Sequence, residues 1–530
     1  MMRRKLMRLN KILIIFFVFS LLFVGNFVSA QELLPNDPHY NKQWYLEKLN
    51  MPQVWAEETG KNTVIIAVID SGVDISHPDL RDNIWVNQKE ILGNGLDDDN
   101  NGYIDDINGW DFVTNTNDPS PKYDKNCLAK NTCIEEAILH GTFIAGVAAA
   151  IGNNLQGITG MSWRTKIMPL RVLNQNGAGN THDVIAAINY AVNNGADIIN
   201  LSFVGDTYDP ALGRALENAF KAGVLIVAAA GNEDFEGHTL NLDINKMYPV
   251  CHQGTDGENI IIGVAASDQN NKLAHFSNHG SSCVDVVAPG QDFFGVVIND
   301  PQIKSFGDYY GGYYSGTSLA APVVSGLAAL IKSFSPFLTN KEIRDAILNN
   351  TDNIDYLNPE LAGKLGMGLI NPVKVFQSLK IIGGSVGLVK GSGPTVYYQA
   401  VDSKRYIFPA ETTYLSWYDD FKNIRQISDA ELASLAIGGN VTIRPGSKLV
   451  KITSDPKVYA VSRGGVLRWV ETEAIARELY GERWALYVVD ISDAFFINYN
   501  LGEPIKTASD FDPFIEKNQV ISIDIDKGLL

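Results

Sequence analysis

Apolar, β-branched runs alternate with amphipathic helix patterns from Thr63 to about Val375, and this alternation restricts the fold more than any other feature. The runs typical of strands buried on both faces are residues 63–69, 167–173, 198–203, 224–229, 260–265 and 284–287. Helix patterns lie between and after them, including Thr181–Asn194, a helix opened by Asp209-Pro210, and a capping box that begins at Thr339. This order predicts an α/β domain with three layers, αβα, and a mostly parallel sheet.

The chain has 530 residues, which is too long for one ordinary core, and a second domain is predicted after the alternating region. Leu388-Val389-Lys390 recurs as Leu449-Val450-Lys451, and Ile427–Ala430 recurs at Ile491–Ala494. These recurrences indicate two repeats of about 62 residues each. The predicted organisation is a signal peptide at 1–30, the α/β domain at 31–380, a linker at 381–387, a small α+β repeat domain at 388–504 and a tail at 505–530.

The N-terminus has the pattern of a secretory signal. Five basic residues between Arg3 and Lys11 precede the apolar run Ile12–Val24, and Val28-Ser29-Ala30 then supplies a small-residue cleavage site. The run is shorter than the ~20 residues that a membrane-spanning helix needs. We therefore expect cleavage after Ala30 rather than an uncleaved anchor. The expected protein is extracellular, free or associated with the cell surface, with no stable membrane insertion after cleavage.

Charge restricts the partners of the mature chain. After removal of residues 1–30 it carries 38 basic and 60 acidic residues, a net charge of −22. Such a surface disfavours nucleic acid and anionic membranes as partners, and it suits a soluble protein that binds cations.

Four cysteines, Cys127, Cys133, Cys251 and Cys283, fit a secreted chain with disulfides, and four cysteines allow three connectivities. The preferred pairing is Cys127–Cys133, which closes a small loop, with Cys251–Cys283. A zinc site is the alternative, although the paired C-x-x-C spacing is absent.

Three segments far apart in the sequence each carry one polar residue of a hydrolytic triad. They are Val68–Gly72, His140–Thr142 and Gly316–Pro322, which contain Asp70, His140 and Ser318. A carboxylate, an imidazole and a hydroxyl are the groups needed to attack a carbonyl, and the order Asp, His, Ser separates this arrangement from other serine hydrolases. A fourth segment, Ala229–Asn232, supplies the Asn232 amide as a donor for the resulting oxyanion.

Each of these residues also has a structural interpretation. Asp70 after a strand is typical of a helix cap, and Ser318 before a small-residue helix ending at Phe334 is typical of an N-cap. His140 is predicted to open a helix over 140–151, where the helix N-terminus disfavours a protonated imidazole and so favours a neutral base. Ser318 at a helix N-terminus would place an oxyanion beside free N–H groups.

Taken together with Gly316-Thr317-Ser318-Leu319-Ala320-Ala321-Pro322, these segments make residues 36–375 resemble the subtilisin-like serine proteases. The resemblance implies an Asp70–His140–Ser318 triad that cleaves polypeptides through an acyl-enzyme, with Asn232 and the Ser318 N–H as oxyanion donors. It further implies that residues 200–203 form an edge that pairs with the substrate backbone, and that two segments line the S1 pocket. The implied substrate-binding residues are Asn200, Leu201, Ser202, Phe203, Gly205, Ala229, Ala230 and Gly231.

The chain departs from this family in two ways. Phe143 stands where the family usually has a second histidine after the His-Gly-Thr segment. Only about 40 residues separate Ala30 from Asp70, too few for an inhibitory pro-domain of the kind many secreted members carry. We therefore expect folding to depend on bound metal rather than on a pro-domain.

The segment 97–105 has the oxygen spacing of a calcium loop, with Gly102 at its sixth position. Its twelfth position is Asn108, so the bidentate glutamate of a full EF-hand is missing, and an acidic turn is the alternative. The predicted Ca²⁺ ligands are Asp97, Asp99, Asn101, Tyr103 and Asp105. The family resemblance implies a second calcium site at Asp79 and Asn154.

Two other functions are alternatives to proteolysis. An α/β-hydrolase esterase needs G-x-S-x-G and a later Asp and His, but the last histidine, His279, precedes Ser318. An inactive scaffold whose repeats bind a surface or a glycan is the second rival. Aromatic residues of the repeats could stack on glycans, although core packing accounts for most of them.

Overall fold

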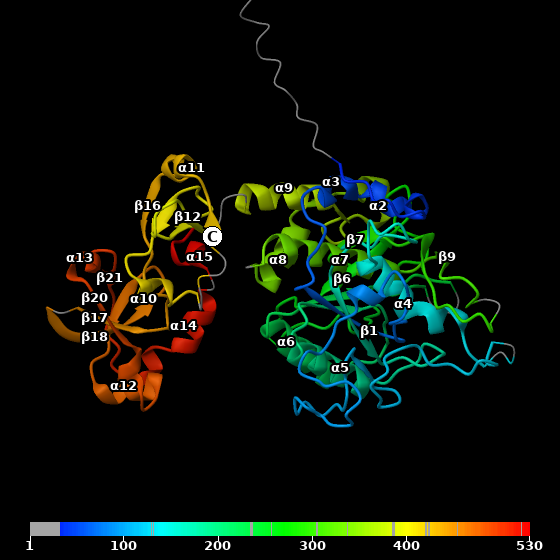
Figure 1. The fold of residues 1–530 in the computed structure, drawn as a ribbon, viewed down its shortest axis with the longest axis horizontal. Coiled ribbons are helices and arrows are strands. Elements are labelled where there is room, and N and C mark those ends of the chain that lie inside the picture. Colours follow the sequence, from blue (N-terminus) through cyan, green and yellow to red (C-terminus); the bar gives the residue numbers. More distant parts are fainter. Residues whose placement is uncertain are drawn as a thin grey trace, which may run out of the picture. The chain divides into compact units, whose positions relative to one another are not determined.

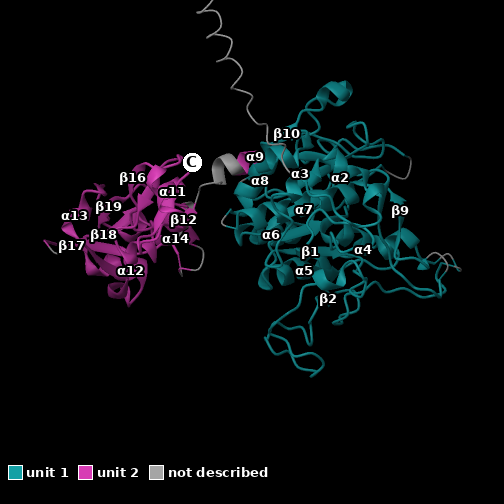
Figure 2. Cartoon of the chain, turned by 45° about the horizontal axis from the view of Figure 1, so that its top comes forward, with its two compact units in different colours: residues 1–376 teal, residues 377–530 magenta. Residues whose placement is uncertain are grey.

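The computed structural model describes residues 32–529 apart from 129, 131, 234–236, 256, 304–305, 337, 384–386, 419–420, 422–423, 453 and 521. The predicted signal peptide, 1–30, lies outside the described residues. The chain divides into two compact units, 1–376 and 377–530 (Figure 2). The division falls inside helix α9 (Pro372–Gly383), whose last residues occupy the start of the predicted linker at 381–387.

Unit 1 is built on a nine-stranded sheet in the order β10-β11-β7-β6-β5-β4-β1-β3-β2. Within it β10 and β11 pair antiparallel, and every other neighbouring pair is parallel. The strands are β1 Ile65–Asp70, β2 Trp110–Asp111, β3 Lys166–Arg171, β4 Ile198–Leu201, β5 Leu225–Ala229, β6 Ile262–Ser267, β7 Val286–Pro289, β10 Thr351–Asp352 and β11 Leu369–Ile370. A separate hairpin joins β8 (Phe293–Val296) to β9 (Tyr310–Tyr314).

Helices cover both faces of this sheet, as the sequence predicts (Figure 1). On one face, alternate strand residues such as Ala67, Ile69 and Leu201 share a core with helices α5 (Thr181–Asn193) and α6 (Pro210–Lys221). The residues between them point to the opposite face. There α4 (Glu135–Ala149) and α7 (Thr317–Phe334) pack against each other and against the strands. The helices of this unit are α2 Trp44–Lys48, α3 Met51–Trp55, α4 Glu135–Ala149, α5 Thr181–Asn193, α6 Pro210–Lys221, α7 Thr317–Phe334, α8 Asn340–Leu348 and α9; the first core contains α5 and α6.

Helix α7 is the central helix of unit 1. It is the one helix among the described residues that is long and apolar enough to cross a membrane, but 83% of that stretch is buried. Burial of this kind marks a core helix, and Gly326 shows how closely it is packed. A Cβ at this position would lie 2.8 Å from the Ala148 carbonyl of α4.

Strand β1 is the point where the strand order reverses, with β3 on one side and β4 on the other. Ligand sites in open α/β sheets lie beyond the carboxyl ends of strands at such a point. Asp70 is the last residue of β1, so the sheet places it at this position.

Unit 2 consists of two repeats with the same sheet topology, β15-β12-β13-β14-β16 and β20-β17-β18-β19-β21. In each sheet the second, third and fourth strands of the order pair antiparallel, and both outer strands pair parallel. The strands are β12 Gly387–Lys390, β13 Tyr397–Gln399, β14 Arg405–Ile407, β15 Arg425–Gln426, β16 Ile437–Asn440, β17 Leu449–Ile452, β18 Asp455–Ser462, β19 Val466–Trp469, β20 Val488–Ile491 and β21 Asn500–Leu501. The helices are α10 Glu411–Tyr414, α11 Asp429–Ser434, α12 Glu473–Tyr480, α13 Asp493–Phe496, α14 Pro513–Gln519 and α15 Ile523–Asp526.

The prediction that 505–530 is a tail is wrong. Ile505 and Phe511 lie in a core of the second repeat, and Ile523 lies in the core of the first. The Asp524 carboxylate accepts hydrogen bonds from the Tyr398 hydroxyl and from the Val401 N–H at 2.9 Å. The last 26 residues therefore belong to the folded repeats.

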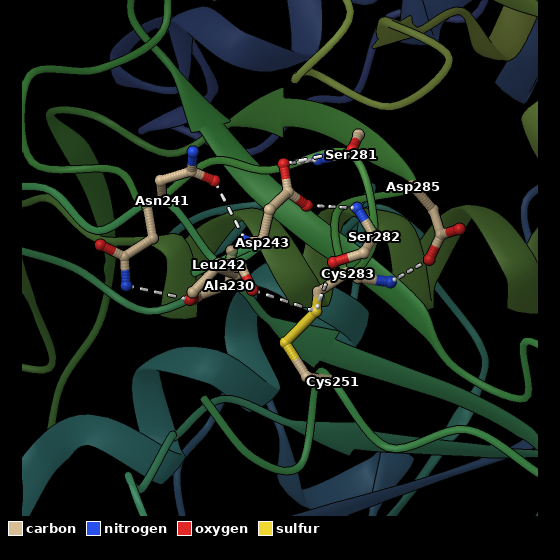
Figure 3. The surroundings of a disulfide bond; sticks show 11 residues. Ala230, Asn241, Leu242, Asp243, Cys251, Ser281, Ser282, Cys283 and Asp285 are labelled. Carbon is tan, nitrogen blue, oxygen red and sulfur yellow. Dashed lines mark hydrogen bonds between the residues drawn. A yellow bond between two sulfur atoms is a disulfide. The ribbon is translucent and has the colours of Figure 1, made fainter. Parts of the chain in front are cut away.

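Both preferred disulfides, Cys127–Cys133 and Cys251–Cys283, are present. Around the second bond, the Asp243 carboxylate accepts the Ser281 N–H at 3.0 Å and the Ser282 N–H at 2.8 Å (Figure 3). These contacts join the segment before Cys251 to the turn that carries Cys283. The disulfide therefore lies within a cross-linked region on the α5 and α6 side of the sheet.

Candidate active site

The end of β1 and helix α4 bring Asp70 and His140 together. The buried Asp70 carboxylate accepts a hydrogen bond from His140 Nδ1 at 2.8 Å and one from the Ser71 N–H at 2.6 Å, both at Oδ1. Gly141 makes the approach possible, because a Cβ there would lie 2.3 Å from the Gly72 carbonyl oxygen. Since Nδ1 faces the carboxylate, Nε2 is left to act on another group.

The expectation that His140 opens a helix is wrong. Helix α4 begins at Glu135, so His140 is its sixth residue, and two glutamates occupy the first turn. Burial lowers the pKa of His140, but the Asp70 charge, its hydrogen bond and the Glu136 charge together raise that pKa above the ordinary 6.5. The helix N-terminus therefore does not hold this imidazole neutral, and the nearby carboxylates favour its protonated form.

Ser318 lies in the first turn of α7, where backbone N–H groups have no partner within the helix. The Asn232 side chain lies beside this turn, and its Oδ1 accepts the Thr317 N–H at 2.9 Å and the Thr317 hydroxyl at 3.0 Å. A Cβ placed on Gly316 would lie 2.9 Å from Ser318 Oγ and 3.3 Å from Asn232 Nδ2. The hydroxyl and the amide nitrogen therefore border one small space beside Gly316.

A chain of hydrogen bonds through the core ends at the backbone carbonyl of Ser318. Pro322 has no N–H for the Ser318 carbonyl, which instead accepts the Ser202 hydroxyl at 2.8 Å. Ser202 Oγ in turn accepts the Asn200 amide at 2.9 Å, and Asn200 Oδ1 accepts the Ser325 hydroxyl at 2.8 Å. Sequence reasoning missed this arrangement, because it depends on side chains from β4 and α7 meeting in the core.

The predicted substrate-binding edge is wrong for Asn200 and Leu201. Strand β4 lies inside the sheet, and both residues pair with β1 on one side and β5 on the other. Their backbone groups are therefore engaged within the sheet. Asn200 and Ser202 are also almost fully buried and support Ser318 instead.

Phe203 and Gly205 lie at the wall of a cavity. Together with Val204 they line a cavity of about 300 Å³, which the segment Gly177–Thr181 borders as well. Gly177 and Gly179 were not among the predicted binding residues. The signal for them is the glycine-rich stretch between β3 and α5, which leaves an open backbone segment.

Ala229, Ala230 and Gly231 lie behind this region and are buried. The Ala230 carbonyl accepts the Asn278 amide at 3.1 Å, and the Gly231 N–H donates to the Thr317 hydroxyl at 3.0 Å. Gly231 has a positive φ of 88°, and a Cβ there would lie 2.9 Å from Val204 Cγ2. The structure thus brings the 203–205 and 229–231 segments together.

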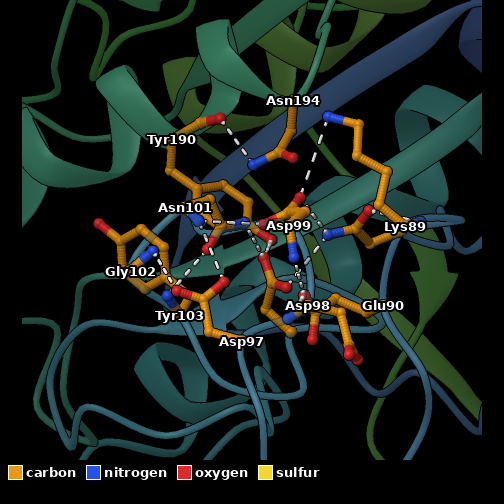
Figure 4. A network of polar contacts seen from close by, with 12 residues as sticks. Lys89, Glu90, Asp97, Asp98, Asp99, Asn101, Gly102, Tyr103, Tyr190 and Asn194 are labelled. Carbon is orange, nitrogen blue, oxygen red and sulfur yellow. Dashed lines mark hydrogen bonds and ion pairs between the residues drawn. The ribbon is translucent and has the colours of Figure 1, made fainter.

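The 97–105 loop forms a polar network in which only part of the predicted ligand set converges (Figure 4). Carboxylate oxygens of Glu90, Asp97 and Asp99 lie within 4.8 Å of one another. Asp105 turns away and accepts the Gly93 N–H at 2.8 Å and the Gly95 N–H at 3.0 Å. Asp105 does not converge with these three carboxylates, whereas Glu90, which was not predicted as a ligand, does.

The other two predicted ligands of the loop are used locally. Asn101 Oδ1 accepts the Tyr103 N–H at 2.8 Å, and the Asn101 amide donates to Asp106 at 3.0 Å. The Tyr103 ring packs against Trp110 and Tyr190. Close to the three carboxylates, Lys89 Nζ lies 3.9 Å from Asp99. Three carboxylates beside one ammonium retain a net negative charge, which fits a divalent cation with oxygen ligands.

Asp79 and Asn154 are in contact, as the second predicted site requires. Asn154 Nδ2 donates to Asp79 Oδ1 at 2.8 Å, and the Ile158 N–H donates to Oδ2 at 3.0 Å. Asp37, which sequence reasoning missed, accepts the Asn153 and Asn154 N–H groups. Burial raises the pKa of both Asp37 and Asp79, because it desolvates their charged forms. Carboxylate oxygens are the ligands that a hard cation such as Ca²⁺ prefers.

Residues 61–368, more than half of the chain, match the model of the subtilase family. The chain belongs to the subtilase family of serine endopeptidases. The resemblance found in the sequence and the predicted α/β fold are thereby confirmed.

A thermophilic serine proteinase of Bacillus sp. (strain AK1) is 36% identical over 330 residues, which cover 62% of this chain and 67% of the relative. The halolysin-like extracellular serine protease Nep of Natrialba magadii is 31% identical over 327 residues, 62% of this chain and 50% of the relative. The chain thus spans about two thirds and one half of these two proteins. A solved structure of proteases from Pseudoalteromonas arctica PAMC 21717 has a TM-score of 0.50 and 27% identity, covering 65% of this chain and 99% of that one.

Proposed function

We propose that this subtilase is a secreted serine endopeptidase stabilised by calcium, with Asp70, His140 and Ser318 as its triad. Two geometric observations carry the proposal. His140 Nδ1 lies 2.8 Å from the Asp70 carboxylate, and the position of a Gly316 Cβ lies close to both Ser318 Oγ and Asn232 Nδ2. A base fixed by a carboxylate, together with a hydroxyl and an amide donor around one space, suits acyl transfer.

In the proposed reaction His140 Nε2 takes the proton of the Ser318 hydroxyl as Oγ attacks the scissile carbonyl. Asp70 fixes the imidazole tautomer and stabilises the imidazolium. Asn232 Nδ2 and the Ser318 N–H donate hydrogen bonds to the oxyanion. His140 then gives the proton to the leaving amine, and water releases the acyl group in the reverse sequence.

Polypeptides are the proposed substrates. The cavity between Gly177–Thr181 and Phe203–Thr207 is open, mixed in polarity and next to the Ser202 residue that supports Ser318. We propose that side chains on the acyl side of the scissile bond enter it. Ala229–Gly231, which pack behind Val204, would form the rear wall of the neighbouring S1 pocket.

Calcium is the proposed structural ion. Glu90, Asp97 and Asp99 would hold one ion, and Asp37, Asp79 and the Asn154 carbonyl oxygen would hold a second. When bound, the ion supplies charge neutralisation to buried or clustered carboxylates, and it takes no part in bond cleavage.

Secretion is proposed from the N-terminal pattern of residues 1–30 and from the two disulfides, which persist in oxidising compartments. One of the relatives, the protease Nep, is named as extracellular. The net charge of −22 disfavours nucleic acid as a partner.

The deciding experiment is labelling of the purified mature protein by a fluorophosphonate probe, with and without calcium. Ser318→Ala should abolish labelling, whereas Ser315→Ala, a change to an exposed neighbouring serine, should leave it in place. Absence of labelling from folded wild-type protein in both calcium conditions would refute the proposal and favour an inactive scaffold.

A further inference from the structure

The two repeats of unit 2 carry the same pocket at equivalent positions. In the first repeat a cavity of about 450 Å³ is lined by Pro394, Thr395, Val396, Phe408, Ala410, Glu411, Tyr414 and Phe421. In the second a cavity of about 300 Å³ is lined by Pro456, Lys457, Val458, Trp469, Val470, Glu471, Thr472, Glu473, Ala476 and Trp484.

Most positions of the two linings correspond. Pro394 and Pro456, Val396 and Val458, and Glu411 and Glu473 are identical pairs, each separated by 62 positions. Four further pairs of lining positions follow the same offset but differ in residue type. Phe421 and Trp484 are separated by 63 positions, and Trp469 and Glu471 line only the second pocket.

Each pocket is built in the same way from its repeat. Pro394 and Val396 precede β13, whereas Pro456 and Val458 lie in the first half of β18. The glutamate is the first residue of the helix, α10 or α12. The aromatic residue follows that helix in the chain. In the first repeat the Phe421 ring stacks on Tyr414 with centroids 4.4 Å apart, and it remains 48% exposed.

The exposed part of this ring is available to a ligand in the pocket. In the second repeat Lys457 Nζ lies 4.8 Å from the Trp469 ring centroid at the pocket wall. Glu473 is exposed and accepts a 2.8 Å hydrogen bond from Arg477. Aromatic faces with a carboxylate at the rim offer both apolar contact and hydrogen-bond acceptors to one ligand.

We propose that these twin pockets bind a neutral polysaccharide, one sugar unit or short segment in each pocket. A sugar ring presents an apolar C–H face to an aromatic side chain and hydroxyl donors to a carboxylate. The charged group that both pockets share is a glutamate, which disfavours an anionic ligand. Two similar small sites on one chain suit a ligand that itself repeats. Once one unit of the ligand is bound, the second site meets the next unit at a high effective concentration.

Charge distribution supports a binding role separate from the catalytic unit. Residues 388–530 contain 16 basic and 19 acidic residues, so nearly all of the net negative charge of the mature chain lies in residues 31–387. A nearly neutral module can approach surfaces that repel the acidic peptidase.

The test uses the full mature chain carrying Ser318→Ala, which prevents self-digestion. Its binding is measured on a glycan array and by co-sedimentation with insoluble cellulose, chitin, amylose and xylan. Binding to at least one neutral polymer is expected, with competition by its soluble oligomers. Phe421→Ala or Trp484→Ala should each weaken binding at least tenfold, because one of two linked contacts is lost. Tyr487→Ala, an exposed aromatic outside both pockets, is the matched control and should bind normally.

Trp484 also packs on the second core, so its variant could lose binding by unfolding. Glu411→Ala with Glu473→Ala changes two exposed helix-start residues instead, and it should abolish binding while far-UV circular dichroism stays unchanged. Three results would overturn the proposal. They are absence of binding to every neutral glycan on the array, equal binding by the double variant, and binding restricted to anionic polymers or to unfolded polypeptide.

Discussion

Pro322 lies four residues after Ser318 in α7, so the Ser318 carbonyl has no helical N–H partner and accepts the Ser202 hydroxyl at 2.8 Å. A proline inside a helix is normally costly because it removes one hydrogen bond and crowds the preceding turn. Here the carbonyl that lacks a helical partner binds Ser202, the residue that follows β4. The proposed nucleophile is thereby fixed to the sheet at the residue itself.

Ser202→Ala should leave that carbonyl buried without a partner and lower the free energy of unfolding by about 1–3 kcal/mol. It should also lower kcat more than it changes KM, since Ser318 is held less firmly. Denaturant unfolding and steady-state kinetics would measure both effects. Adding Pro322→Ala restores a helical N–H for the same carbonyl, so the double variant should recover part of the lost stability. Additive losses in the double variant would contradict this account.

Asn232→Ala should reduce kcat by about 10²–10³ by removing one oxyanion donor. Asn232→Asp separates the loss of the oxyanion donor from the loss of the hydrogen bonds that Asn232 accepts from Thr317. It preserves the acceptor for the Thr317 N–H and hydroxyl but has no amide to donate. We therefore expect Asn232→Asp to melt closer to wild type than Asn232→Ala while being at least as inactive. A kcat for either variant within threefold of wild type would show that Asn232 has no such role.

The pKa of His140 predicts the acid limb of the pH profile. Burial lowers this pKa, but Asp70 and Glu136 raise it above 6.5, so kcat/KM should increase with pH through a pKa above that value as the neutral base forms. Glu136→Gln removes a negative charge, lowers the pKa of His140 and should shift the limb to lower pH. Glu135→Gln is the control and should shift it less. An unmoved or upward-shifted limb in Glu136→Gln would be inconsistent with this assignment.

Calcium binding at the 97–105 loop should depend on Glu90 and not on Asp105. Calcium should raise the melting temperature of the wild type, because an ion bound only by the folded state stabilises it. Glu90→Gln should reduce this calcium-dependent increase, since Glu90 lies in the carboxylate cluster. Asp105→Asn should lower the melting temperature equally with and without calcium, because Asp105 holds the Gly93 and Gly95 N–H groups. Scanning calorimetry with calcium or chelator would distinguish the two, and the reverse pattern would restore Asp105 as the ligand.

The sheet, its buried strands and the positions of Asp70, His140 and Ser318 could be predicted because each depends on local order along the chain. A run of apolar residues ending in Asp, or a small-residue helix beginning near Ser, is visible without knowing what packs where. The start of α4 was misplaced because the two glutamates and the apolar residues before His140 follow a disulfide loop that hides the helix boundary. Asn200, Ser202 and Glu90 were misassigned or missed for a different reason. Their roles depend on which side chains meet across strands or loops, and spacing along the sequence carries no such information.

Removal of residues 505–530 should unfold unit 2 and leave the peptidase active. Ile505, Phe511 and Ile523 are buried in the repeat cores, and Asp524 and Asp526 tie the C-terminal helix to both repeats. The Asp526 carboxylate accepts the Gly464 N–H at 2.8 Å and the Thr442 hydroxyl at 2.9 Å. Losing these contacts exposes apolar side chains to water, at a cost of roughly 25 cal/mol for each Å² of surface. The free energy of unfolding of a small domain is only about 5–15 kcal/mol, so this loss should unfold the repeats. Limited proteolysis should then degrade the repeats rapidly, while fluorophosphonate labelling of Ser318 persists. Protease-resistant repeats in the truncated chain would show that the last 26 residues are dispensable after all.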